Sequence, residues 1–254
     1  MNQIVRFIYL YIERIRSYGF KGYGEFQVIS RYHFLMARAI LLDMDGVLID
    51  SERHWHSIEG AWLRTVIPGW NDTHQKDCVG LSMSGLHDML RDKHNLSMEF
   101  PDFRTAYMDL AECIYREKAD LMPRCQEFLE SSRDAGMKLA VVSSSPKDWI
   151  QIMVRRFGIA DYFSYLISAD DVGGVGKPDP AVYLHAANKV EESPANCIAI
   201  EDSENGVLSA RRAGMHCVGF RNGLNDAQRL DLAHHIIHGF SAEAVESILS
   251  ICRK

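Results

Sequence analysis

Two aspartates separated by a single residue follow a short apolar run near residue 40. Residues 39–42 (Ala-Ile-Leu-Leu) leave no room for a polar face, which predicts a strand buried on both sides, and Asp43 and Asp45 stand at its end. In an open α/β sheet, ligands bind beyond the carboxyl ends of the strands. Two carboxylates that face one space repel each other, so one must ionise beside a cation and the other can hold a proton. Taken alone, the fragment is explained equally well by an Asp-Gly turn with a helix-capping acid.

Polar residues also follow later apolar runs. Ser143 ends one run, Lys177 lies in a glycine-rich loop after another, and Glu201 and Asp202 end a third. The carboxyl ends of parallel strands share one edge of a sheet, so these groups converge. Carboxylates hold a hard cation, whereas a lysine and a strand-to-helix turn rich in N–H groups hold phosphoryl oxygens. Each group has a plain structural explanation, as a cap or a solvated cation, but their joint occurrence in this order favours a magnesium and phosphate site.

Strands and helices alternate regularly in the second half of the chain. Because helices of this length between strands require parallel pairing and right-handed crossovers, the sequence predicts an α/β fold with a Rossmann-like, doubly wound parallel sheet. We expect strands at residues 138–142, 166–168, 197–200 and 216–220, and helices at about 123–135, 147–157, 180–190 and 204–213.

Residues 53–119 show helical periodicity and no convincing strand. A first helix starts at Ser51-Glu52 and ends before Pro68-Gly69, and two more are expected at 84–94 and 102–119. We therefore expect an all-helical cap domain at 53–119, inserted into a core that comprises residues 37–52 and 120–254. The apolar face of the first helix carries Trp55, Ile58, Trp62 and Val66.

The bulk composition excludes some classes of protein. A chain of 254 residues that is 47% hydrophobic can bury a sizeable core. Its net charge of −6 argues against a nucleic-acid-binding surface. The six cysteines form no C-x-x-C pair, which favours reduced thiols in a cytoplasmic protein over a disulfide framework or a zinc site.

Residues 1–36 differ from the rest of the chain. Their apolar run is too short to span a bilayer, and they lack the features of a signal peptide. We expect a dispensable N-terminal extension in preference to a helix that contacts a membrane or a partner.

Four motifs in order resemble those of the haloacid dehalogenase superfamily. Within it, Asp50-Ser51-Glu52 and the pattern Glu201-Asp202-Ser203-x-x-Gly206-Val207 resemble the branch that contains sugar-phosphate phosphatases and β-phosphoglucomutases. That branch carries a helical cap after the first motif, and the resemblance covers residues 37–250. The four motifs are Asp43-Met44-Asp45-Gly46-Val47, Val142-Ser143-Ser144-Ser145, Gly176-Lys177-Pro178-Asp179-Pro180 and Ile200-Glu201-Asp202-Ser203.

The resemblance implies a role for each acid. Asp43 would be the nucleophile that forms an aspartyl phosphate beside Mg²⁺. Asp45 would be the general acid and then the base, and its backbone carbonyl would touch the metal. Asp202 would be a direct metal ligand, with Glu201 close by.

The resemblance also implies how the phosphoryl group is held. Lys177 would neutralise charge during transfer, and Ser143 would bind a phosphoryl oxygen. Backbone N–H groups of Met44, Asp45, Gly46 and Ser144 would bind the others.

Positions that hold the substrate of β-phosphoglucomutases differ in this chain. Those enzymes have a histidine twelve residues after the nucleophile, where this chain has Trp55. They also have a lysine and an arginine in the cap loop, where this chain has Val79 and Met83. In the mutases, these two cationic side chains hold the second phosphate of a bisphosphate. Their absence here favours hydrolysis of a monophosphate over the mutase reaction. Trp55 resembles the tryptophan of hexitol and 2-deoxyglucose phosphate phosphatases and could contact a sugar, although a helix-packing role is equally well supported.

Other motifs carry no expected chemistry. His234-His235-x-x-His238 has metal-like spacing but lies beyond the catalytic strands, so a structural or surface role is expected. The cap methionines are expected to pack, namely Met83, Met89, Met98 and Met108.

The sequence thus predicts a monomeric, magnesium-dependent phosphatase of small sugar or polyol monophosphates, without nucleic-acid or membrane contact. A β-phosphoglucomutase-type phosphomutase is the first alternative. A non-catalytic binding or regulatory protein with the same fold is the second.

Overall fold

The computed structural model describes residues 37–71, 73–78 and 81–252. The predictions for residues 1–36 and for Val79 lie outside the described residues.

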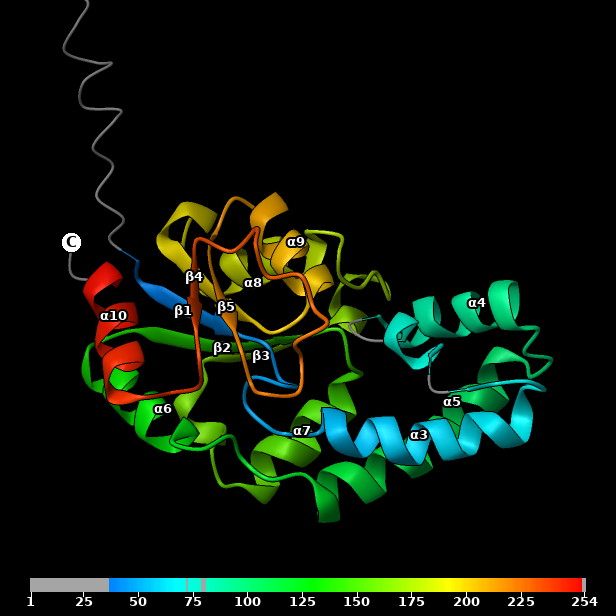
Figure 1. The fold of residues 1–254 in the computed structure, drawn as a ribbon. Coiled ribbons are helices and arrows are strands. Elements are labelled where there is room, and N and C mark those ends of the chain that lie inside the picture. The colour runs from blue at the N-terminus through cyan, green and yellow to red at the C-terminus, as the bar shows by residue number, and fades with distance from the viewer. Residues whose placement is uncertain (1–36, 72, 79–80, 253–254) are drawn as a thin grey trace, which may run out of the picture. The chain divides into compact units, whose positions relative to one another are not determined.

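One parallel sheet organises the described residues, with the strand order β3-β2-β1-β4-β5-β6 (Figure 1). Strand β1 pairs in parallel with β2 on one side and with β4 on the other. The chain adds β2 and β3 on one side of β1 and then returns to add β4, β5 and β6 on the other side, so the order of the strands switches between β1 and β4. Such a switch point is where open α/β sheets bind ligands. The strands are β1 (Ala39–Leu42), β2 (Lys138–Ser143), β3 (Tyr165–Ser168), β4 (Cys197–Glu201), β5 (His216–Phe220) and β6 (His235–Ile237).

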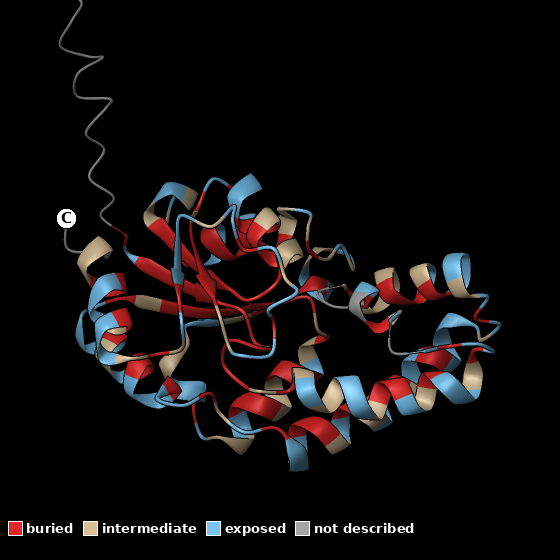
Figure 2. Cartoon of the chain, viewed as in Figure 1, coloured by how far each residue is buried: buried red, intermediate tan, exposed pale blue. Residues whose placement is uncertain are grey.

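Helices cover both faces of the sheet, as their alternation with the strands predicted. Along β1, Ile40 and Leu42 face the cluster formed with α6, α7 and α10, whereas Ala39 and Leu41 face the cluster formed with α8 and α9. All four side chains are fully buried, which confirms a strand buried on both sides (Figure 2). The helices are α6 (Cys125–Asp134), α7 (Lys147–Arg156), α8 (Ala181–Lys189), α9 (Glu204–Arg212) and α10 (Ala242–Cys252).

Helices also make up the segment inserted after β1. Leu63, Leu90 and Phe103 are buried there, and the predicted all-helical insertion is confirmed. Its exact boundaries at 53 and 119 remain a prediction. The insertion contains α3 (Glu52–Val66), a short 3₁₀ turn η1 (Gln75–Asp77), α4 (Met83–His94), α5 (Phe100–Cys113) and a π-helical turn η2 (Ile114–Lys118). No described helix combines the length and the apolar character needed to cross a membrane.

Two elements near the C-terminus were not predicted. Strand β6 has three residues, of which His235 and Ile236 are exposed. It therefore lacks the apolar run that would have predicted a strand. Helix α10 does carry Ala244, Ile248 and Leu249 at helical spacing on a buried face, a signal that could have found it. The predicted structural role of the histidine motif is borne out in part, since His235 begins β6.

Cysteines and methionines behave as expected in the described residues. Cys78, Cys125, Cys197 and Cys217 are free and buried. The four cap methionines pack against the main core cluster, although Met83 also lines a pocket.

Candidate active site

The turn after β1 brings the first two acids to the switch point. Gly46 closes this turn with φ of +80°, a conformation that glycine adopts without strain. A Cβ atom at Gly46 would lie 2.0 Å from Asp202 Oδ2. Glycine is therefore required both by the turn and by the close approach of the Asp202 carboxylate, which follows β4.

Three buried acids meet at this edge of the sheet. Asp43, Glu201 and Asp202 each offer a carboxylate oxygen, and these oxygens lie within 4.8 Å of one another. Burial, followed by the charges of Glu52 and Asp43, raises the pKa of Asp202 well above its ordinary value. The predicted convergence of β1 and β4 is therefore observed, and it concentrates negative charge in a buried space.

Lys177 is the cation that faces this cluster. Its ammonium lies 2.5 Å from Asp43 Oδ1 and 2.6 Å from Glu201 Oε1, and it donates to the carbonyl of Val142 at 2.9 Å. Burial alone would lower the pKa of Lys177, but the carboxylates of Asp43 and Glu201 outweigh burial and raise that pKa. Lys177 therefore stays charged, and one lysine faces three acids.

The donor set of the three acids fits a hard divalent cation. Carboxylate oxygens are the ligands that Mg²⁺ prefers, and the cluster brings three acidic side chains together beside a single lysine. Glu201 Oε1 already accepts a hydrogen bond from Tyr183 at 2.6 Å, whereas Glu201 Oε2 is buried and finds no hydrogen-bond partner among the described residues. A buried carboxylate oxygen without a partner is costly, and a bound cation would satisfy it.

Two asparagines after β5 hold Asp202, and sequence reasoning missed both. Asn222 Nδ2 donates to Asp202 Oδ2 at 3.1 Å and to the Gly46 carbonyl at 3.0 Å. Asn225 Nδ2 donates to the carbonyls of Asp202 at 2.7 Å and Phe220 at 2.8 Å. The signal was available, because Asn222 follows an apolar run just as the other polar residues do.

The serines after β2 form the turn that leads into α7. Ser143 Oγ accepts a hydrogen bond from the Ser145 N–H at 3.0 Å, and Ser144 Oγ accepts one from the Lys177 N–H at 3.3 Å. Both Ser143 and Ser144 are buried. The turn thus lies beside the lysine loop and before a helix N-terminus, a place suited to phosphate oxygens.

Asp45 is held separately from the three acids, by three hydroxyl groups. Ser51 Oγ donates to Asp45 Oδ1 at 2.5 Å, Tyr115 Oη to the same oxygen at 2.8 Å, and Ser145 Oγ to Oδ2 at 2.9 Å. Burial and then the charge of Asp43 raise the pKa of Asp45 to about 6, although the three hydrogen bonds oppose the rise. Asp45 can therefore gain and lose a proton near neutral pH.

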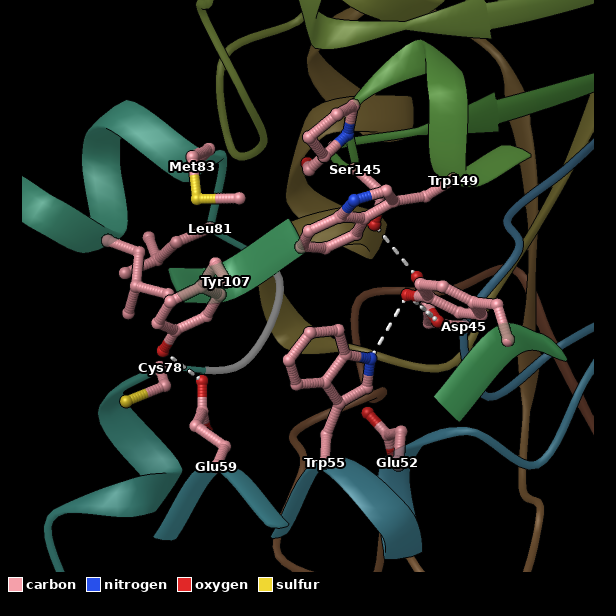
Figure 3. A pocket seen from close by; sticks show the side chains of 14 residues that line it. Asp45, Glu52, Trp55, Glu59, Cys78, Leu81, Met83, Tyr107, Ser145 and Trp149 are labelled. Atoms are coloured by element: carbon pink, nitrogen blue, oxygen red, sulfur yellow. Dashed lines mark hydrogen bonds between the residues drawn. The ribbon is translucent and has the colours of Figure 1, made fainter. Parts of the chain in front are cut away.

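A pocket of about 120 Å³ opens beside Asp45 (Figure 3). Ser145 and Trp149 line it from the core, and Trp55, Tyr107 and Tyr115 line it from the inserted helices. The remaining lining residues are Glu52, Glu59, Cys78, Leu81, Met83, Leu86, Ser144 and Pro146.

Trp55 has contacts that fit both interpretations of its role. It lines the pocket, and its ring centroid lies 5.8 Å from that of Tyr107 and 5.2 Å from that of Trp149, in stacked arrangements. Its Nε1 donates to Tyr115 Oη at 3.0 Å. Trp55 therefore packs within an aromatic cluster and at the same time borders the space next to Asp45.

Comparison of the sequence with known proteins identifies the family to which this chain belongs. Residues 37–214 match the family of haloacid dehalogenase-like hydrolases. Hexitol phosphatase B of Escherichia coli is 30% identical over 185 residues, which cover 71% of this chain and 82% of that protein. Phosphorylated carbohydrates phosphatase of Thermotoga maritima is 28% identical over 197 residues, covering 76% and 89%.

Among solved structures, the β-phosphoglucomutase of Clostridium difficile superposes with a TM-score of 0.69 at 23% identity, covering 85% of this chain and 98% of that chain. That likeness concerns the fold. The match to the family spans most of the chain and includes β1, the inserted helices, β4 and the loop that carries Lys177. The resemblance that the four motifs predicted is confirmed, and the chain belongs to the haloacid dehalogenase-like hydrolases.

Proposed function

We propose that this protein is a magnesium-dependent phosphatase that hydrolyses small sugar or polyol monophosphates through an aspartyl phosphate on Asp43. The observation that carries the proposal is that Asp43 contacts Lys177 and shares one buried cluster with Glu201 and Asp202, with Asp45 and a pocket alongside. A nucleophile, a proton carrier and a space for the leaving group are thus within one site.

Hydrolysis would proceed in two balanced steps. In the first, a carboxylate oxygen of Asp43 attacks phosphorus, the ester P–O bond breaks, and the leaving alkoxide takes a proton from Asp45. In the second, water attacks the phosphorus, its proton passes to Asp45, and the bond to Asp43 breaks to release phosphate. The position of Asp45 at the pocket, with a pKa near 6, supports both roles.

Lys177 and the serine turn would hold the transferring group. Lys177 already contacts Asp43 Oδ1, so its charge lies where phosphoryl oxygens would gather. Ser143, Ser144 and the backbone N–H groups of Met44, Asp45 and Gly46 would bind those oxygens.

Mg²⁺ would be held by Asp43, Asp202 and Glu201 together with the backbone carbonyl of Asp45. The buried, unpaired Oε2 of Glu201 and the excess of acids over Lys177 support this assignment. When bound, the ion supplies positive charge that offsets the charge of the phosphoryl oxygens.

The named activities of the relatives support the substrate class. One is a hexitol phosphatase and another a phosphatase of phosphorylated carbohydrates. An aromatic pocket wall formed by Trp55 and Trp149 suits the C–H faces of such molecules. We propose that Trp55 contributes to substrate binding in this way.

The nucleophile is tested by Asp43→Asn. Phosphate release from a panel of phosphomonoesters, with MgCl₂ or with EDTA, should fall by at least about 10³-fold in the variant, because the amide cannot form the acyl phosphate. Asp134→Asn on α6 is the matched control, since the Asp134 side chain is 78% exposed. Asp43→Asn that keeps both its melting temperature and its turnover would refute the assignment.

The same assay separates the alternatives. A phosphomutase would isomerise a hexose phosphate with little free phosphate and would depend on a bisphosphate primer. A non-catalytic protein would release no phosphate from any ester of the panel, with or without MgCl₂.

A further inference from the structure

One face of helix α3 borders the pocket. Glu52, Trp55 and Glu59 are three and seven residues apart, which places them on the same side of a helix, and all three line the pocket (Figure 3). At about 1.5 Å of rise per residue, Glu59 lies about 10 Å along the helix axis from Glu52. Glu59 therefore marks the end of the pocket that is farther along α3 from the first motif.

Glu59 is a buried carboxylate with two defined neighbours. Its side chain accepts hydrogen bonds from Tyr107 Oη at 2.5 Å and from Gln75 Nε2 at 2.9 Å, one on each oxygen. Each carboxylate oxygen has two acceptor positions, so further acceptor capacity remains. Glu59 is only 6% exposed, and it forms no ion pair with any lysine or arginine whose side chain is described.

The pocket lining contains acids and no basic side chain. Among the described residues that line it, the acids are Asp45, Glu52 and Glu59, and none is a lysine, arginine or histidine. A second phosphate or a carboxylate on the leaving group would lie against these acids without a cation to pair with. Hydroxyl groups, by contrast, can donate to a carboxylate, and the aromatic walls accept C–H surfaces.

We propose that Glu59 is a specificity-determining residue, which accepts a hydrogen bond from a distal hydroxyl of an uncharged sugar or polyol leaving group. Together with Glu52 it excludes leaving groups that carry a second phosphate or a carboxylate. The proposal rests on the phosphatase function proposed above and narrows its substrate class.

The first test uses the unaltered protein. Values of kcat/KM are measured with sorbitol 6-phosphate, fructose 6-phosphate, fructose 1,6-bisphosphate and para-nitrophenyl phosphate in MgCl₂. The two monophosphates should exceed the bisphosphate by at least about tenfold, because the second phosphate meets only acids. Equal or faster turnover of the bisphosphate overturns the proposal.

Two variants then separate the contact from the charge. In Glu59→Gln, the ratio of kcat/KM for sorbitol 6-phosphate to that for para-nitrophenyl phosphate should fall about tenfold, mainly through KM, because only the sugar alcohol offers distal hydroxyls. The discrimination against the bisphosphate should weaken as well. Glu59→Asp keeps the carboxyl group but withdraws its oxygens by one methylene. The preference for sorbitol 6-phosphate over para-nitrophenyl phosphate should therefore fall in this variant, whereas the discrimination against the bisphosphate should remain.

Controls make the outcomes distinct. Glu112→Gln on α5 alters an acid whose side chain is 54% exposed and should leave both ratios unchanged. Unchanged ratios in Glu59→Gln would overturn the specificity role, and so would equal effects of Glu59→Gln and Glu59→Asp on both ratios. In either case, continued turnover of para-nitrophenyl phosphate would leave the phosphatase function in place. Absence of phosphate release from all four esters would instead refute the phosphatase function.

Discussion

At the scale of single residues, Tyr115 links the general acid of the proposed mechanism to the inserted helices. Its hydroxyl donates to Asp45 Oδ1 and accepts from Trp55 Nε1, so it fixes the direction in which the Asp45 carboxylate points. Tyr115 is fully buried in η2, and burial with the nearby Asp45 charge raises its pKa, which keeps it a hydrogen-bond donor. Tyr115 is therefore a positioning residue in this structure.

Tyr115→Phe should lower kcat about tenfold with little change in KM, because the carboxylate of Asp45 loses one of three hydroxyl donors while the pocket keeps its shape. Steady-state kinetics on a hydrolysed monophosphate measure both constants. Tyr165→Phe on β3 is the control, since Tyr165 is 41% exposed. An unchanged kcat in Tyr115→Phe would show that Ser51 and Ser145 orient Asp45 without help.

At the scale of elements, helix α9 begins directly behind the acid cluster. Gly206, in its first turn, lies so close to Glu201 that a Cβ atom there would stand 1.8 Å from Glu201 Oε2. Glycine weakens a helix by about 1 kcal/mol relative to alanine, so its presence calls for a reason in packing. The close approach of the Glu201 carboxylate supplies that reason, and it explains the glycine in the pattern Glu201-Asp202-Ser203-x-x-Gly206-Val207.

Gly206→Ala should displace the Glu201 carboxylate and weaken magnesium binding. The concentration of MgCl₂ that gives half-maximal activity should rise about tenfold, and the increase in melting temperature on addition of MgCl₂ should shrink. Gly85→Ala in α4 serves as the helix control, because its Cβ would lie 3.3 Å from the nearest atom, Ser82 Oγ. A variant with the magnesium response of the unaltered protein would remove Glu201 from the metal site.

At the scale of the whole molecule, a cluster of histidines joins the last two strands of the sheet. The ring of His216 on β5 stacks on that of His234 with centroids 4.3 Å apart, and His235 lies 5.1 Å away. Burial, followed by the charges of His234 and His235, lowers the pKa of His216 to about 4. His216 is thus neutral in the folded protein where a free histidine would begin to take up a proton.

The contribution of His216 to the free energy of unfolding should therefore decrease as the pH falls from about 6.5 to about 4, because in this range the His216 side chain binds a proton in the unfolded chain and not in the folded chain. His216 contributes its full stabilisation above pH 6.5. The difference in free energy of unfolding between the unaltered protein and His216→Gln, measured by urea unfolding at several pH values, should therefore change in favour of the variant as the pH falls from about 6.5 to about 4. His238→Gln, which alters an exposed histidine of the same segment, should reproduce the pH dependence of the unaltered protein.

The sequence by itself determined five of the six strands of the sheet, the inserted helices and the convergence of Asp43, Ser143, Lys177, Glu201 and Asp202. These features follow from local patterns: apolar runs make buried strands, and parallel strands bring their ends to one edge. The family resemblance rested mainly on the same strand ends, which is why it extended to the acids and the lysine but reached the pocket only at single positions such as Asp45 and Trp55.

Only the tertiary structure decided which side chains meet across elements. Tyr115 reaches Asp45 over 70 positions in sequence, Tyr107 reaches Glu59 over 48, and Asn222 reaches Gly46 over 176. Helical periodicity places the two tyrosines on apolar faces and carries no information about which carboxylate each hydroxyl will find. Such contacts depend on how the inserted helices pack against the core, and that packing is a property of the folded chain and not of any local pattern.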